Sequence, residues 1–362
     1  MKSDPFANVE KRFKKDLGVI VNDLIYFRPI AIILYGGYGR DEGSWVWDKN
    51  EKNCTPYNDY DIMMILESKI SPNVIKTKRK ELAKKIGIRW IDLDQKTISE
   101  LKNLDLLIVN YDLKYASKVI YGDGKITDLI PEMSPENITL KDGNILFFTR
   151  MWTLLGSLNK EGLKVDREGE EARFFRNQMA KALLAIVDVL LIQKGQYDPS
   201  YKERVRRLKK YYHQKKKLIQ LANWALIEKL NPKGPHMSSK EITSLYNDVY
   251  NQYFKVMYQM LTKYYKREIK NSIDIEISLK WSLVGLVKRI GWILIKWNFQ
   301  MEKRILLNIG QLFILEAYNY GNVNNLYLKK GLQSLNKIDK TIPISLTWDE
   351  ARCKAAQLRL TI

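Results

Sequence analysis

The first 150 residues alternate between short apolar runs and polar or amphipathic stretches. The apolar run at 31–35 ends at Gly36-Gly37, which is typical of a buried strand that enters a tight turn. The run at 59–66 starts with two carboxylates and continues as an unbroken apolar stretch, which predicts a second strand. Residues 88–93 predict a third strand, with Asp92 and Asp94 at its end. These runs have the length of strands rather than of helices.

Helices separate the predicted strands. Ser71-Pro72 opens a basic helix that continues to about Ile86, and Gly87 stands in the usual stop position. A capping box at 97–100 starts another short helix. Strands that alternate with helices indicate an α/β domain, and residues 131–142 are interpreted as the linker that follows it.

From about residue 146 the apolar positions change to a helical period. Residues 168–194 predict a helix that ends at a glycine cap, and residues 202–230 predict a second one. A capping box at 238–241 begins a third helix, and residues 280–318 indicate one or two long apolar helices. We therefore expect an α/β domain at 1–140 and a mainly helical, basic domain at 141–362, which could divide again near 231–240.

Composition removes several classes of protein. Two cysteines among 362 residues exclude a disulfide framework and a four-cysteine zinc site, and two histidines disfavour Ser-His-Asp hydrolysis and histidine-rich metal sites. No run of 18 apolar residues occurs, and the first residues do not resemble a signal peptide. We expect a soluble, cytoplasmic protein that is not integral to a membrane.

Positive charge is concentrated in the second domain. Residues 1–150 carry 24 Lys/Arg and 22 Asp/Glu, and residues 151–362 carry 37 and 19, so nearly all of the net charge of +20 lies after residue 150. The segment 202–217 alone has nine basic residues, one Glu and three nearby tyrosines. This asymmetry favours an anionic partner such as RNA, with a lysine-rich solvated surface as the competing interpretation.

Acidic residues at the strand ends suggest a metal site. Side chains alternate along a strand, so Asp59 and Asp61 lie on the same face, where a divalent cation would remove their repulsion. A third carboxylate on a neighbouring strand would complete a site for two ions. Asp92 lies between two apolar residues of the third strand and is the preferred third carboxylate, with Asp94 as the alternative. The Gly36-Gly37 turn would let backbone N–H groups approach a phosphate.

The order of Gly-Gly, Asp-x-Asp and an aspartate between apolar residues resembles the polymerase-β-like nucleotidyltransferase superfamily. The run 36–42 is also similar to the glycine motif of bacterial regulatory-protein uridylyltransferases. The resemblance covers residues 28–125 and implies a small mixed sheet, two Mg²⁺ ions, for which Mn²⁺ could substitute, and transfer of a nucleoside monophosphate from an NTP, with ATP favoured, to a hydroxyl. It implies that Asp59, Asp61 and Asp92 are the catalytic metal ligands and that Gly36 and Gly37 hold the triphosphate.

Within the resembling segment, one spacing departs from the family pattern, and one residue has two interpretations. The 21 residues between Gly37 and Asp59 exceed the usual spacing, so 45–57 is expected to form an extra hairpin or loop. Arg40 is a candidate nucleotide ligand, with a local ion pair to Asp41 or Glu42 as the alternative.

The acceptor is left open by the sequence. The basic second domain favours RNA, such as a tRNA end bound through 202–217, and a protein acceptor comes next. Synthesis of cyclic oligonucleotides or modification of a small molecule are further alternatives. Two alternatives are not enzymes. One is a non-catalytic protein that binds nucleotide or RNA, and the other, less favoured, is a membrane-surface or assembly protein that uses 280–300. The apolar helices at 280–318 leave room for an oligomer.

Overall fold

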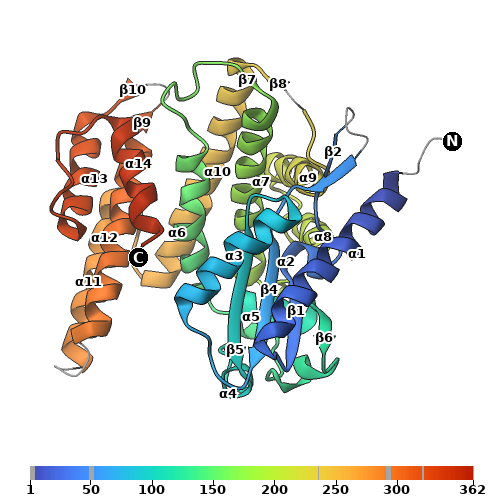
Figure 1. The fold of residues 1–362 in the computed structure, drawn as a ribbon. Helices are drawn as coiled ribbons and strands as arrows, with labels where there is room; N and C mark the ends of the chain where they lie inside the picture. Colours follow the sequence, from blue (N-terminus) through green and yellow to red (C-terminus); the bar gives the residue numbers. More distant parts are fainter. Residues whose placement is uncertain (1–4, 49–52, 235, 291–294, 320–321, 362) are drawn as a thin grey trace. The chain divides into compact units, whose positions relative to one another are not determined.

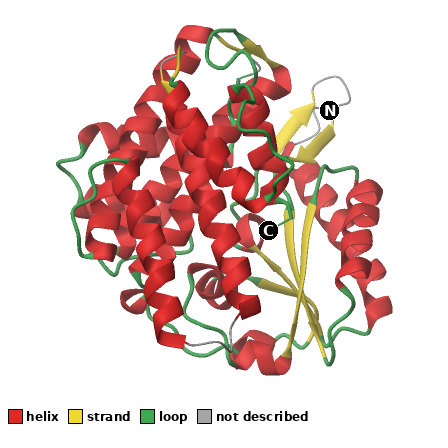
Figure 2. Cartoon of the chain, turned by 90° about the vertical axis from the view of Figure 1, so that its left-hand side faces the viewer, coloured by secondary structure: helices red, strands yellow, loops and turns green. Residues whose placement is uncertain are grey.

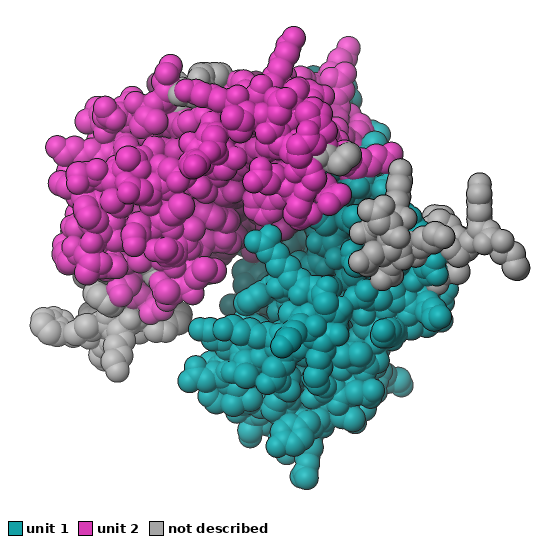
Figure 3. All heavy atoms as spheres, turned by 45° about the horizontal axis from the view of Figure 1, so that its top comes forward, with its two compact units in different colours: residues 1–139, 191–215, 226–232 teal, residues 140–190, 216–225, 233–362 magenta. Residues whose placement is uncertain are grey.

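The computed structural model describes residues 5–48, 53–234, 236–290, 295–319 and 322–361. It is a mixed α/β protein with one small mixed sheet and many helices, as Figures 1 and 2 show. The predicted fold class is confirmed at this level. The chain forms two compact units, which Figure 3 colours separately: unit 1 comprises 1–139, 191–215 and 226–232, and unit 2 comprises the remaining residues.

The central sheet of unit 1 has the strand order β5-β4-β1-β6. The strand β1 runs antiparallel to both of its neighbours, whereas β4 and β5 are parallel. The parallel pair needs a crossover, which the helix α3 (Pro72–Ile86) supplies before Gly87 ends it in the left-handed conformation. The strands are β1 (Ala31–Tyr35), β4 (Tyr60–Leu66), β5 (Ile91–Thr97) and β6 (Lys118–Gly122).

Helices cover both faces of this sheet. Ile62 and Met64 pack on one side against α1 (Pro5–Leu24) and α3, and Met63 and Ile65 pack on the other side. Burial on both faces explains why the second strand is apolar without alternation. The second face is covered by α4 (Ile98–Lys102), α5 (Ile108–Tyr115) and the short 3₁₀ segment Ile126–Leu129; two further 3₁₀ turns span Ile25–Phe27 and Pro135–Asn137.

Three elements of unit 1 differ from the sequence analysis. The long helix α1 was not predicted, although its apolar residues recur at helical spacing from Phe13 to Leu24. Its buried face also includes Asp16, which accepts hydrogen bonds from Arg12 and Tyr60. Strand β5 begins and ends later than the predicted 88–93, because pairing with β4 extends it through polar residues to Thr97. Strand β6 had no counterpart among the predicted strands.

The expected extra hairpin is present between β1 and β4. Strands β2 (Trp45–Asp48) and β3 (Asn53–Pro56) pair antiparallel, as predicted for a hairpin or loop at 45–57. Trp45 packs edge-on against Phe13 of α1 and against Tyr38. The hairpin is therefore attached to the core through aromatic contacts.

Unit 2 is built almost entirely from helices. The helix α7 is its most buried element, and its apolar residues predicted at 183–191 are at most 3% exposed. The helices are α6 (Leu140–Gly156), α7 (Gly169–Ile192), α10 (Ser239–Tyr265), α11 (Ser272–Ile290), α12 (Ile295–Ala317), α13 (Asn325–Ile338) and α14 (Trp348–Arg359). Two short antiparallel strand pairs accompany them: β7 (Arg167–Glu168) with β8 (His236–Met237), which are distant in the chain, and β9 (Tyr318–Asn319) with β10 (Asn322–Val323).

The prediction of a single helix at 202–230 is wrong. Two helices occupy this segment, α8 (Tyr201–Tyr211) and α9 (Lys216–Leu230), and they are separated by a turn in which Lys215 N donates to Tyr212 O. Neither glycine nor proline marks the break. Burial of the Tyr212 side chain, which is 8% exposed, accompanies it.

The units are not consecutive in the chain. The first boundary lies at Thr139/Leu140, next to the predicted one, but residues 191–215 and 226–232 belong to unit 1 although they were expected in the helical domain. Glu42, which is 4% exposed, connects the segment 191–215 to the first part of unit 1. Its carboxylate accepts from the N–H groups of Tyr201 and Lys202 and from Ser200 Oγ, so it caps the N-terminus of α8.

The change Glu42→Gln should lower the stability of the protein, because a buried carboxylate that accepts several hydrogen bonds and pairs with Arg40 loses its charge. We expect a loss of about 2 kcal/mol and a decrease in Tm of roughly 4–8 °C by calorimetry. The neighbouring Asp41→Asn is the control, since the exposed pair of Asp41 with Lys118 should matter little. Equal Tm values for the two variants would contradict the role of Glu42.

Candidate functional site

Three aspartates come together at one end of the sheet. Asp61 lies directly opposite Asp92 in the parallel β4–β5 register, and Asp59 precedes β4 by one residue. One carboxylate oxygen from each of the three lies within 4.8 Å of the others. The predicted set Asp59, Asp61 and Asp92 is thus brought together, close enough for one cation to contact all three.

The glycine turn lies against this cluster. Gly36 has a φ of +64°, and a Cβ atom placed on it would come within 1.9 Å of Asp61 Oδ2. Only glycine fits there, both because of its backbone conformation and because of the carboxylate. Gly37 is different: the nearest atom to a Cβ would be Glu42 O, at 3.5 Å, which is ordinary contact. The two glycines begin a single helical turn, α2 (Gly36–Gly39).

The cluster is electrostatically strained without a cation. Burial raises the pKa of Asp61 to about 8, and the charges of Asp59 and Asp92 add to this, while Arg40 and Lys229 partly oppose it. The pKa of Asp92 is also raised, first by burial, although a hydrogen bond from Trp90 Nε1 at 2.6 Å lowers it. A divalent cation would relieve this repulsion, so the three carboxylates suit Mg²⁺.

Asp94 is positioned differently from Asp92, although both lie on the same face of β5. It is exposed, and its carboxylate accepts from the N–H of Gln95. Among the residues that the structure describes, it is not part of the group that could share a metal ion. This geometry favours Asp92 as the third carboxylate.

Arg40 is engaged by protein groups rather than left open. Its guanidinium pairs with Glu42 at 3.2 Å and with Asp112 at 3.1 Å, and it stacks 4.4 Å from the ring centre of Tyr201. Tyr197 also donates to Asp112. These contacts correspond to the ion-pair interpretation, in which Arg40 holds α8 and α5 beside the glycine turn.

Several groups near the cluster had no recognisable signal in the sequence. Trp90 orients the Asp92 carboxylate through its hydrogen bond. Arg79 of α3 donates to the carbonyl of Leu93 and contributes positive charge near Asp92. Lys229 Nζ donates to Asn58 Oδ1 at 3.1 Å, next to Asp59 in the chain. Lys229 is 171 residues from Asn58, so only folding could reveal this contact.

The basic helix α8 is less open than its sequence indicates. Arg206 and Arg207 pair with Glu203, and Arg204 is buried between the rings of Tyr197 and Tyr201. The exposed cations on its surface are Lys202, Arg206, Lys209 and Lys210. Two of the three tyrosines near this segment are not open for base stacking: Tyr201 lies between two guanidiniums and Tyr212 is buried.

The segment 280–300, the candidate membrane-surface or assembly region, consists mostly of residues whose side chains the structure does not describe. Trp281 is 70% exposed, and Trp292 lies outside the described residues. No helix among the residues that the structure describes is long and apolar enough to cross a membrane.

Comparisons with known proteins add no relative. No protein-family model matches the chain, and neither a curated protein nor a solved structure is significantly similar to it.

The change Gly36→Ala should destabilise the protein, whereas Gly37→Ala should not. An alanine at a positive φ costs about 1–2 kcal/mol, and here its methyl group would also overlap Asp61. We expect a lower Tm for Gly36→Ala by calorimetry and a near-normal Tm for Gly37→Ala. Tolerance of alanine at both positions would show that the turn does not press against the aspartate.

The change Asp61→Asn should raise Tm in the absence of metal. With its pKa raised to about 8, Asp61 must take up a proton or bury a charge when the protein folds near neutral pH, whereas an Asn of the same shape does neither. Excess Mg²⁺ should raise Tm for the unchanged protein by at least roughly 3 °C and leave the variant unaffected. Asp94→Asn, on the same face but outside the cluster, is the control and should respond to Mg²⁺ normally. A Mg²⁺ shift that persists in Asp61→Asn would place the ion elsewhere.

Proposed function

We propose that this protein is a Mg²⁺-dependent nucleotidyltransferase that moves a nucleoside monophosphate from an NTP, ATP in the first instance, to a hydroxyl group. The observation that carries the proposal is the convergence of Asp59, Asp61 and Asp92 to within 4.8 Å beside a glycine turn. Neither feature is specific alone. Their juxtaposition on adjacent strands is the arrangement that the resemblance to polymerase-β-like nucleotidyltransferases leads one to expect.

Each residue of the cluster has a separate role in the proposed reaction. Asp59 and Asp61 would hold the metal ions, and Asp92 would accept the proton of the attacking hydroxyl, directly or through water. The metal ions would supply charge stabilisation for the attacking and leaving oxygens. Trp90 fixes the Asp92 carboxylate through its hydrogen bond and is therefore a positioning residue.

The glycine turn would bind the triphosphate. Gly36 permits the backbone to pass close to Asp61, and the N–H groups of the turn would donate to phosphate oxygens. Arg40 would act indirectly, since its guanidinium is already shared between Glu42 and Asp112. We assign it the role of holding α8 next to the turn rather than that of a phosphate ligand.

RNA is the favoured acceptor, and a protein is the next candidate. Unit 1 contains both the aspartate cluster and α8, whose N-terminus is bonded to Glu42, five residues after Gly37. The exposed Lys202, Lys209 and Lys210 would contact phosphates, so binding should weaken steeply with salt. With the tyrosines of α8 occupied, backbone contact rather than base stacking would supply the affinity.

The reaction is tested by incubating the full-length protein with each α-³²P-labelled NTP and Mg²⁺, together with cellular RNA, lysate protein or no acceptor. We expect label on one acceptor class, and its loss, by about a hundredfold or more, in Asp59→Asn/Asp61→Asn. Asp94→Asn is the matched control and should keep the activity. Label on a small product without added acceptor would indicate a cyclic oligonucleotide or a small-molecule acceptor.

The main alternative is a non-catalytic protein that binds nucleotide or RNA. Its signature would be NTP or RNA binding without transfer of label under any of these conditions. Label transfer that survives in Asp59→Asn/Asp61→Asn would overturn the assignment of the aspartates, whatever the acceptor.

A further inference from the structure

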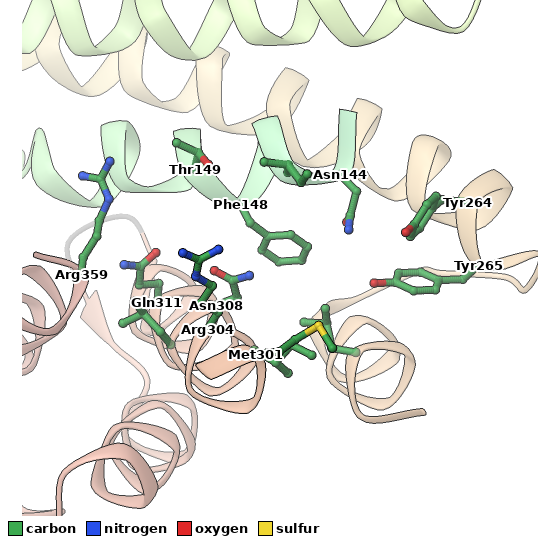
Figure 4. A pocket seen from close by; sticks show the side chains of 14 residues that line it. Asn144, Phe148, Thr149, Tyr264, Tyr265, Met301, Arg304, Asn308, Gln311 and Arg359 are labelled. Carbon is green, nitrogen blue, oxygen red and sulfur yellow. The ribbon is translucent and has the colours of Figure 1, made fainter. Parts of the chain in front are cut away.

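Unit 2 contains a groove of about 430 Å³. It is lined by residues of five helices: α6, α10, α11, α12 and α14. Figure 4 shows the side chains of α6 and those of α12 facing each other across it. This volume lies in the range of sites for small organic ligands. None of the residues that line it is acidic.

The two ends of the groove differ in chemistry. In Figure 4, Arg304, Arg359, Asn308 and Gln311 gather at one end, and Tyr264 and Tyr265 lie at the other, with Phe148 between them. One end therefore offers guanidinium and amide donors, and the other offers flat aromatic surface. A ligand that matches both ends carries an anion at one end and a ring at the other.

The arginine end has no acidic counter-charge among the described residues that line the groove. Neither Arg304 nor Arg359 forms an ion pair with any residue that the structure describes. The pKa of Arg359 is lowered, first by burial and then by the neighbouring Arg150. Arg304 and Arg359 are both exposed and line one cavity, and the guanidinium of Arg359 lies 5.7 Å from the ring centre of Trp152. Two such cations on one cavity, with a third near Arg359, favour occupation by an anion.

Two buried amide atoms in the lining have no hydrogen-bond partner among the residues that the structure describes. Gln311 is 2% exposed, and within that part of the chain its Nε2 donates to no group and Asn144 Oδ1 accepts no hydrogen bond. Buried polar atoms of this kind are rare and costly, so a ligand that pairs with them gains affinity. Gln311 lies at the arginine end, where its N–H groups would add to an anion site. Asn144 lies nearer the tyrosines and needs an N–H donor.

We propose that this groove is a second ligand site that binds a nucleoside monophosphate, with the phosphate at Arg304, Arg359 and Gln311 and the base near Phe148 and the tyrosines. A nucleobase supplies both the flat ring and the ring or amino N–H that Asn144 Oδ1 lacks. An acyl chain or a simple aromatic acid would leave that oxygen unpartnered. This site shares no residue with the aspartate cluster, so it does not rest on the proposed reaction.

The test is calorimetric titration of the full-length protein with AMP, GMP, CMP and UMP in EDTA, which withholds metal from the aspartates. We expect at least one nucleotide to bind, and adenosine and inorganic phosphate to bind far more weakly. Arg304→Gln and Arg359→Gln should each weaken the nucleotide by about tenfold or more. Lys354→Gln, an equal charge change on α14 outside the groove, should have no effect.

Two further variants separate this site from the proposed active site and from a general effect of charge. Thr149→Trp fills the groove from an exposed position without removing charge, and it should abolish binding. Asp61→Asn should leave the affinity unchanged. The proposal is overturned if no nucleotide binds, if inorganic phosphate binds as tightly as the nucleotides, or if the arginine variants bind like the unchanged protein.

Discussion

The register of β4 against its two neighbours governs the arrangement of unit 1. Tyr35, Asp61 and Asp92 form one row across β1, β4 and β5. This row places Gly36 against the Asp61 carboxylate and places two like charges directly opposite each other. Pairing of like charges across strands is unfavourable, so the extensive apolar burial of β4 on both faces must hold the register. Burial and the charges of Asp59 and Asp92 raise the pKa of Asp61 as a result.

Carboxylates that are held close together against their mutual repulsion would form a preorganised site for the proposed metal ion. If the aspartates repelled each other into solvent, a cation would have to assemble them on binding and would bind more weakly. Here the strands fix Asp61 and Asp92, and the Trp90 hydrogen bond further restrains Asp92. Because these positions are rigid, Asp61 would serve the proposed reaction and at the same time lower the stability of the metal-free protein.

The segment after the glycines joins distant parts of the chain. Arg40 and Glu42 contact α5 and α8, and Ser44 Oγ donates to the carbonyl of Lys229. These contacts place residues 191–215 and 226–232 in unit 1. They also consume much of the positive charge and aromatic surface of α8. In unit 2, by contrast, two guanidiniums line a groove that its own helices form, and neither pairs with an acidic residue in the described part of the chain.

The sequence by itself determined the central strand, the helix before Gly87, the capping boxes at 97–100 and 238–241, and the grouping of Asp59, Asp61 and Asp92. The strand, the helix and the capping boxes depend on periodicity or on neighbours in the chain, so local rules reach them. The grouping of Asp92 with Asp59 and Asp61 also needed the family resemblance, and the pairing of β4 with β5 sets Asp92 opposite Asp61. The helix α1 was missed although its apolar residues recur at a local helical spacing. Only the tertiary structure decided the break between α8 and α9, the role of Arg40 and the return of 191–215 to unit 1. These depend on contacts such as Glu42 with Tyr201, which are 159 residues apart, and no local pattern encodes a bond across that distance.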